Sequence, residues 1–415
     1  MKKDIVNFSL KEFNKNTFFE FSILLFAFSL PLWRNINTII LLPISIAWLY
    51  HSSWKIKIDY LKQNKNSFLI ILFLYLLFWI GLLLSDNITD NLRDIERGST
   101  LFIIPLFIFS ADPIYFNLKK ITIALGIGLF LGIIICWFHV FVDILSKSDP
   151  AEQAKYFFQW IYSDWKLLAP LGMHPSYFAV LLVLFLSSIM LESDFSDFRK
   201  RRVLYFVTLF ISFLFLLETS SRIAFISITL IFLFYIVKMS SYKKKLFYLL
   251  ILVTIIAISS QFNYLTIKFD KIFDSDGNIS FERIHRWRNI TEVFIDSKDY
   301  IFGTGMGDVD KIYTKAYQKG NFNLALKNKY NAHNQYLEFF VSNGIVGLGT
   351  YLLILLHFVY KTKLRSPYHF NFFLIIILFS ITESIFCRSK GVFFFSFFYS
   401  MLILKSSNVY EKNSQ

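Results

Sequence analysis

The chain has 415 residues, of which 55% are hydrophobic and 17% charged, whereas soluble domains average about 25% charged residues. With only two cysteines, Cys136 and Cys387, both in apolar segments, this composition excludes a disordered chain, a disulfide-stabilised scaffold and a soluble enzyme. The net charge of +14 does not indicate nucleic-acid binding, because the basic residues lie in short clusters between long apolar segments. The sequence therefore predicts a protein that crosses a membrane many times.

Twelve segments are apolar enough to be membrane-spanning helices, which need about 20 residues each. They are residues 17–33, 36–50, 67–85, 99–116, 121–144, 174–192, 203–219, 222–239, 246–261, 335–360, 368–386 and 391–405. The first two are short and are expected to form a tight hairpin. An even number of spans places both termini on the same side of the membrane.

The distribution of Lys and Arg predicts which side this is. With both termini inside, the inner segments hold 23 basic residues and the short outer loops hold nine. Basic residues of short loops are retained in the cytoplasm, so both termini are expected to be cytoplasmic. We expect a protein of the bacterial inner (plasma) membrane whose active site lies on the outer, periplasmic face.

The expected organisation is spans one to nine in residues 1–261, an outer loop in 262–334, and spans ten to twelve with a cytoplasmic tail in 335–415. The loop has about 70 residues, which is too long for a simple connector. It is expected to contain amphipathic helices. It is thus the first place to look for functional groups.

One amphipathic helix is expected at residues 281–295, where apolar residues recur at helical spacing. Arg283 and Trp287 are four residues apart and share a face, Arg286 stands beside them, and Arg288 points elsewhere. A helix that only lies on the membrane surface would also contain Arg and Trp. The pattern alone does not decide between a helix that only lies on the outer membrane surface and one whose Arg283 and Trp287 have a function.

The next two motifs lie after this helix. Residues 303–307 read Gly-Thr-Gly-Met-Gly, which we interpret as a structural turn in preference to a phosphate-binding loop, since no strand precedes it. His333 and Asn334 then stand at the outer end of the span that begins at residue 335. Gly344 and Gly347 in that span are expected to let another helix approach closely.

Arg222 lies on the same side, where the span at 203–219 turns into the span at 222–239 with almost no loop. It follows the hydroxyl-bearing Ser221 and opposes the positive-inside trend, so it is a functional candidate. His174, at the start of another span, ranks lower. Glu383 and Arg388 bracket the last outer turn, and we expect them to form an ion pair with each other.

These motifs, in this order and on one side of the membrane, resemble the superfamily of O-antigen ligases and O-antigen polymerases. Its pattern has an Arg at the outer end of a middle span, a loop with Arg-x-x-x-Trp and Gly-x-Gly, and His-Asn before a helix with Gly-x-x-Gly. The matching residues are Arg222, Arg283 with Trp287, Gly303 with Gly305, His333 with Asn334, and Gly344 with Gly347. Two departures are Ile226 in place of a frequent Leu, and Arg286, which could take the role of Arg283.

The resemblance implies an all-α polytopic fold, GT-C-like, and a glycosyltransferase that uses a glycan on undecaprenyl diphosphate. The acceptor would be a sugar hydroxyl on lipid A core for a ligase, or another lipid-linked unit for a polymerase. No cofactor and no metal is expected, and inversion at the anomeric carbon is a family-level expectation. Arg222, Arg283 and Arg286 would bind the diphosphate, His333 would act as base or phosphate contact, and Asn334, Ser221, Trp287 and His174 would support them.

A different class, a transporter or flippase for lipid-linked sugars, is the less favoured alternative. Transporters usually show related halves and charged or broken helices at the middle of the bilayer. This sequence shows neither, and its polar motifs gather at one surface. The sequence therefore favours an enzyme.

Overall fold

The computed structural model describes residues 15–33, 35–147, 149–158, 160–243, 245, 246, 249, 250, 253 and 282–412. Every regular element within these ranges is a helix. Up to the outer loop these are α1 (Lys15–Ser29), α2 (Ile36–His51), α3 (Trp54–Gln63), α4 (Lys65–Leu84), α5 (Ile88–Gly98), α6 (Thr100–Phe109), α7 (Leu118–Leu145), α8 (Pro150–Ala154), α9 (Trp165–Leu168), α10 (Pro175–Leu191), α11 (Ser196–Lys200), α12 (Arg202–Glu218) and α13 (Arg222–Lys238).

The later helices are α16 (Glu282–Asp296), α17 (Val309–Lys319), α18 (Asn323–Lys327), α19 (Gln335–Thr362), α20 (Pro367–Thr382) and α21 (Ser389–Lys412). Short 3₁₀ turns lie between several of them, including η4 (Ala169–Leu171), η6 (Met306–Asp308) and η7 (Ile385–Cys387). A described helix overlaps each predicted span except that at 246–261, which lies almost wholly outside the described residues.

Three described helices, α4, α7 and α19, are long and apolar enough to cross a membrane on their own. Two bent pairs bring the number to five if each counts as one span: α2 with α3, bent by 105°, and the α9–η4 segment with α10, bent by 84°. The fold is therefore that of a helical membrane protein. The count of twelve spans and the side on which each loop lies stay predictions.

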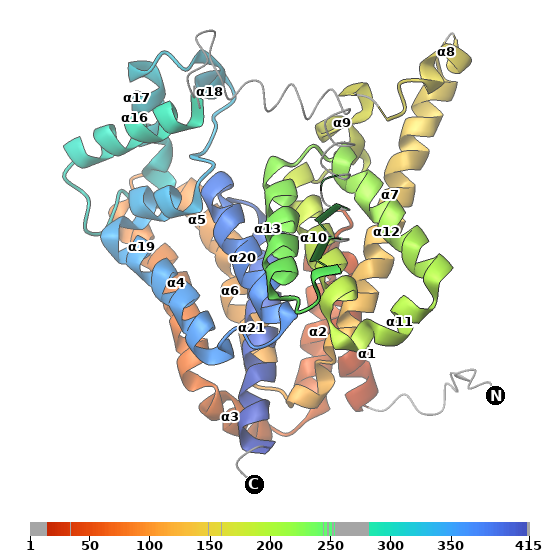
Figure 1. The fold of residues 1–415 in the computed structure, drawn as a ribbon. Coiled ribbons are helices and arrows are strands. Elements are labelled where there is room, and N and C mark those ends of the chain that lie inside the picture. The colour runs from red at the N-terminus through yellow and green to blue at the C-terminus, as the bar shows by residue number, and fades with distance from the viewer. Residues whose placement is uncertain are drawn as a thin grey trace.

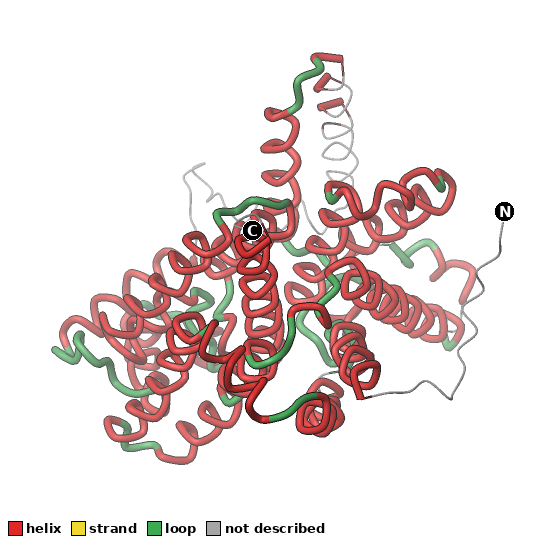
Figure 2. Tube along the Cα trace, turned by 90° about the horizontal axis from the view of Figure 1, so that it is seen from below, coloured by secondary structure: helices red, strands yellow, loops and turns green. Residues whose placement is uncertain are grey.

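The described helices are arranged so that the segments predicted as outer loops and those predicted as inner loops lie at opposite ends (Figure 1). The helices α8, α9 and α16–α18 lie at the upper end, and α3 and α11 lie toward the lower end, where α1 begins and α21 ends. Viewed from below, the described chain is helical almost throughout, with short loops between helices (Figure 2). The cavity described below lies among the segments of the upper end.

The central helix of the bundle is α10, whose residues 175–189 are all buried. A helix that is apolar on every face is stable only when neighbours cover it completely. It packs against α7, α12, α13 and α20. Because α10 is held on all sides, the residues at its beginning have a fixed position beneath the cavity.

The segment from α16 to α18 has a small apolar core that it shares with Val341 of α19. Ile290 and Phe294 of α16 are fully buried there, together with Ile312 and Tyr313 of α17. The ring of Phe294 also meets Phe340 of α19 edge-on, with centroids 4.9 Å apart. The apolar face of α16 is thus covered by protein, and α16 is not a bare helix on a membrane surface.

The glycine-rich segment fastens this outer segment to α19, where the helix is broken at Gly344 (φ 65°, ψ −158°). Backbone N–H groups of Thr304 and Gly305 donate to the carbonyls of Val341 and Ser342, at 3.0 and 2.9 Å. A Cβ atom at Gly344 would lie 2.2 Å from the carbonyl oxygen of Ile301. The close neighbour at Gly344 is therefore the turn at Ile301 and Phe302, and the expectation of a second helix at Gly344 is wrong.

Candidate active site

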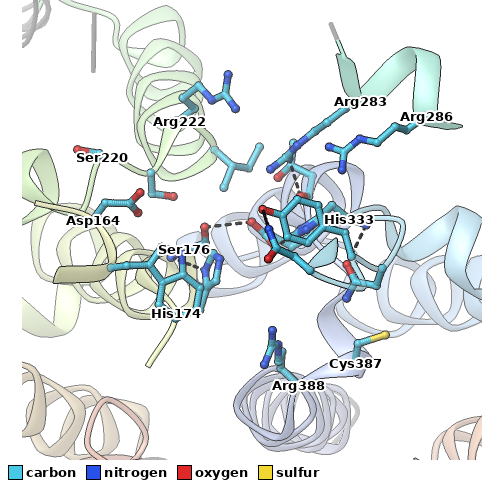
Figure 3. Close-up of a pocket in the computed structure, with 18 of the residues that line it drawn as sticks. Asp164, His174, Ser176, Ser220, Arg222, Arg283, Arg286, His333, Cys387 and Arg388 are labelled. Atoms are coloured by element: carbon cyan, nitrogen blue, oxygen red, sulfur yellow. Dashed lines mark hydrogen bonds and ion pairs between the residues drawn. The ribbon is translucent and has the colours of Figure 1, made fainter. Parts of the chain in front are cut away.

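A cavity of about 530 Å³ lies at the upper end of the bundle and is formed by segments far apart in the sequence. Its walls come from residues before and at the start of α10, the α12–α13 turn, α16, residues 328–333 and the turn after α20. Of the predicted site residues, the structure brings seven together in these walls: His174, Ser221, Arg222, Arg283, Arg286, Trp287 and His333 (Figure 3). Their roles stay predictions.

His333 lies in the wall with its backbone in the left-handed region, at φ 48°. Its N–H donates to Oδ1 of Asn331, and its ring meets Tyr330 edge-on at 5.7 Å. The ring nitrogen Nδ1 lies 3.3 Å from Oε2 of Glu383. If Nδ1 carries the proton toward this carboxylate, the neutral ring presents Nε2 as a proton acceptor.

Asn334, also predicted to support the site, does not line the cavity and acts as a cap. Its side chain accepts a hydrogen bond from the N–H of Leu337 at 3.1 Å, which satisfies a free donor at the start of α19. Its own N–H donates to the Ser384 hydroxyl, at 3.3 Å. Asn334 therefore fixes the helix end that follows His333.

Glu383 is the carboxylate at the centre of the site, and its partners are not the Arg388 that the sequence predicts. Oε1 accepts a hydrogen bond from the Ser176 hydroxyl at 3.1 Å, and Oε2 contacts His333. The expected ion pair with Arg388 is wrong, since α20 ends at Thr382 and the buried Glu383 carboxylate instead faces Ser176 of α10 and His333.

The charge state of Glu383 follows from these neighbours. Burial alone would raise the pKa of the carboxyl, but the His333 hydrogen bond and the nearby charges of His174 and Arg283 hold the pKa well below its usual range. The carboxylate is therefore ionised at neutral pH. It can stabilise positive charge on His333.

Arg283 and Trp287 lie on the face of α16 that covers the cavity, as the four-residue spacing predicts. Nη1 of Arg283 donates to the carbonyl oxygen of Thr382 at 2.8 Å, and Nε1 of Trp287 donates to that of Ala332 at 2.7 Å. Burial lowers the pKa of the Arg283 guanidinium, and the Glu383 charge opposes this shift. Arg283 thus fastens α16 to the end of α20, and Trp287 fastens it to the residue before His333.

Arg286 is the most deeply placed arginine of α16, with 8% of its surface exposed. Its guanidinium lies 5.7 Å from the centroid of the Tyr330 ring. Nε and Nη1 have no hydrogen-bond partner among the described residues, and Glu282 lies at 3.7 Å from Nε. Buried donors of this kind are uncommon and can serve a ligand. Arg288 points away, is 77% exposed and pairs with Glu292.

Arg222 enters the cavity from the opposite wall, as the first residue of α13. The residues before it, Thr219, Ser220 and Ser221, are buried, and Ser220 has φ 51°. The Arg222 charge interacts with the carboxylates of Glu383 and Asp164. Arginines from two walls therefore face a common space, while no group of three or more His, Cys, Asp or Glu side chains suited to a metal ion is found within the described ranges.

Residues 207–352 match a family model described as O-antigen ligase. This confirms the resemblance to the O-antigen ligase superfamily. The matched segment contains Arg222, Arg283, Arg286 and His333, and ends before Glu383. No curated protein matches the chain. An activity of the ligase or polymerase type is thus supported in general terms, together with a lipid-linked glycan donor and a glycan acceptor.

Sequence reasoning missed several residues of the cavity wall, among them Asp164, Trp165, Ser176 and Tyr330. Glu383 was named from the sequence, but only as an ion-pair partner; its position directly after an apolar helix, in Thr382-Glu383-Ser384, was a usable signal that it belongs to the site. No local pattern marked Ser176 or Tyr330, because their importance depends on which segments meet in space.

Proposed function

We propose that the protein is a membrane glycan ligase. It transfers an oligo- or polysaccharide of the O-antigen type from undecaprenyl diphosphate to a sugar hydroxyl, such as one on lipid A core. The observation that supports this most is that Arg222, Arg283 and His333, from distant parts of the chain, line the same cavity. In this proposal the cavity faces the periplasm and both termini lie in the cytoplasm, because the basic residues gather in the predicted inner loops.

The arginines act on the leaving group. When the bond between the anomeric carbon and the diphosphate oxygen breaks, negative charge grows on the diphosphate. Guanidinium groups bind phosphate oxygens in a bidentate manner and stay charged, and preorganised donors of this kind contribute about 3 kcal/mol each to the transition state. Arg222 and Arg283 supply this charge from two walls, and Arg286 brings donors that no described protein group uses.

His333 acts on the acceptor. The acceptor oxygen attacks the anomeric carbon while Nε2 of His333 takes the hydroxyl proton, and the diphosphate leaves with the bonding electron pair. Glu383 at Nδ1 stabilises the imidazolium that forms, which favours the role of base over that of phosphate contact. A single displacement inverts the configuration, and the guanidinium groups supply the positive charge without a metal ion.

The proposal is tested with purified protein in lipid nanodiscs, radiolabelled undecaprenyl-diphosphate glycan and lipid A core as acceptor. Arg222→Ala, Arg283→Ala and His333→Ala should each lower transfer by at least about 100-fold. Arg288→Ala is the matched control, because this exposed arginine of the same helix points away from the cavity. It should keep the wild-type rate.

The outcome also separates the related activities. Transfer to lipid A core supports the ligase, whereas elongation of a second lipid-linked glycan would make the protein a polymerase. Arg222→Lys should fail as well if bidentate geometry matters. Wild-type transfer by all three alanine variants would overturn the proposal.

A further inference from the structure

Trp165 is an aromatic residue of the cavity wall that the catalytic groups above do not use. It begins α9 and is 51% exposed, although Leu167 and Leu168 after it are buried. Its ring meets the His174 ring edge-on, with centroids 4.5 Å apart and an interplanar angle of 84°. Nδ1 of His174 in turn accepts the N–H of Ser176. The indole is thus oriented by the start of α10 and keeps half of its surface accessible.

Asp164, directly before it, also lines the cavity and has a strained backbone. Its φ of 59° and ψ of −126° lie in a region that residues other than glycine rarely occupy. The N–H of Asp164 donates to the carbonyl oxygen of Glu218 at 3.0 Å, and its own carbonyl accepts from Leu168. Such strain persists only where surrounding structure enforces it, and it is typical of functional positions.

The hydrogen bond from Asp164 to Glu218 fixes Asp164 and Trp165 relative to the catalytic groups. Glu218 is the last residue of α12 and lies four residues before Arg222, so Asp164 is fastened to the turn that carries this arginine. Figure 3 shows Asp164, His174 and Arg222 to the left of His333, with Arg283 and Arg286 above it. His333 therefore stands between the wall with Arg283 and Arg286 and the wall that carries Asp164, Trp165 and Arg222.

We propose that Asp164 and Trp165 form a binding subsite for a pyranose ring of the acceptor glycan. A pyranose has an apolar C–H face, which stacks on an indole, and a rim of hydroxyls, which donate hydrogen bonds to a carboxylate. The acceptor assignment rests on the proposed function, because the diphosphate would bind the guanidinium groups of Arg222, Arg283 and Arg286 and would be repelled by the Asp164 carboxylate. A ring held at Asp164 and Trp165 directs one of its hydroxyls toward His333.

The binding test does not need the transfer reaction. Saturation-transfer NMR is recorded on the purified full chain with three probes: methyl β-D-glucopyranoside, methyl β-D-galactopyranoside and methyl N-acetyl-β-D-glucosaminide. At least one should receive saturation on its ring protons, and Trp165→Ala should lower the signal at least about fivefold. Asp164→Asn should lower it as well. Trp79→Ala, which removes a similarly exposed Trp outside the cavity, should leave the signal unchanged.

Absence of binding by all three probes, or an unchanged signal with Trp165→Ala, would overturn the subsite and leave Trp165 as an anchor at the membrane interface. Thermal unfolding of each variant identifies any loss of signal that comes from misfolding, and Trp165→Phe, which keeps an aromatic face, should then retain part of the signal. In the transfer assay, Trp165→Ala should raise the acceptor KM about tenfold and leave the donor KM unchanged. Sugar binding that depends on Trp165 without any transfer would keep the subsite and reject the proposed function.

Discussion

The two walls of the cavity are built in different ways. The wall with Arg222 consists of turns at the ends of helices that belong to the main apolar core, and its residues 219–221 are buried. The wall with Arg283 and Arg286 belongs to a segment with a small, separate apolar core that also includes Val341 of α19. Backbone bonds from residues 300–305 to α19 and the side-chain bonds of Arg283 and Trp287 fasten it to the bundle.

The two arginines of the proposed diphosphate clamp therefore depend on different parts of the structure. Arg222 and Glu383 are placed by packing that a local change alters little. The position of Arg283 depends on how the outer segment docks. A substitution within the first wall should therefore affect chemistry alone, and a substitution at the docking contacts should affect chemistry through geometry.

The largest effect is expected for Glu383→Gln, in the first wall. Glutamine keeps the shape and can still bond Ser176, but it cannot stabilise a positive charge on His333. We expect kcat to fall by about 100-fold or more while the donor KM changes little. Steady-state transfer kinetics measure both quantities.

Glu292→Gln is the control for that change, because Glu292 is a carboxylate of α16 outside the cavity that pairs with Arg288 and Lys319. It should transfer at the wild-type rate. If Glu383→Gln kept a wild-type kcat, the carboxylate would have no part in the proton transfer.

An intermediate effect is expected for Gly344→Ala, at the docking contact. The backbone conformation at Gly344 costs other residues about 1–3 kcal/mol, and the added Cβ would clash with Ile301. We expect a lower melting temperature and transfer reduced by about tenfold, as the outer segment shifts.

Gly349→Ala in the same helix is the matched control, since a Cβ there meets no atom within 4 Å. Thermal unfolding and transfer rates of the two variants should differ clearly. Equal behaviour would show that the docked loop does not set the position of Arg283.

The smallest effect is expected for Lys311→Ala. Its Nζ lies 2.8 Å from Asp86 and 3.0 Å from Asp308, so it joins the outer segment to the turn after α4. Lys311 is exposed, and ion pairs of exposed side chains contribute little. Transfer should stay within about twofold of wild type at low and high salt, and a tenfold loss would make this ion pair part of the docking.

Much of the fold was predictable because long apolar segments have few alternatives to helices in a membrane. The helix α16 was predictable for another reason: its apolar residues recur at helical spacing, which places Arg283 and Trp287 on one face. The span predicted at 99–116 is only partly a continuous helix, since α6 ends at Phe109 and a short 3₁₀ helix follows at Pro113–Tyr115. The sequence predictions include no helix at α5, which is amphipathic and too polar to be a membrane span.

The partners of individual side chains were not predictable. Glu383 was assigned to Arg388, five residues away, because sequence proximity was the available guide, and its actual contacts are 50 and 207 residues away. Gly303, Gly305 and Gly344 could be recognised as special positions, but not as the two halves of one contact. Such pairings depend on how segments meet, which no single segment encodes.

The break in α19 has a consequence for redesign of the protein. At Gly344 the helix gives up part of its internal hydrogen bonding, and residues 300–305 provide the substitute. A chimera that imports the outer segment of a relative must therefore include this six-residue piece as a matched unit with α19. Grafts that exchange only residues 282–299 or only residues 306–327 leave that pairing whole.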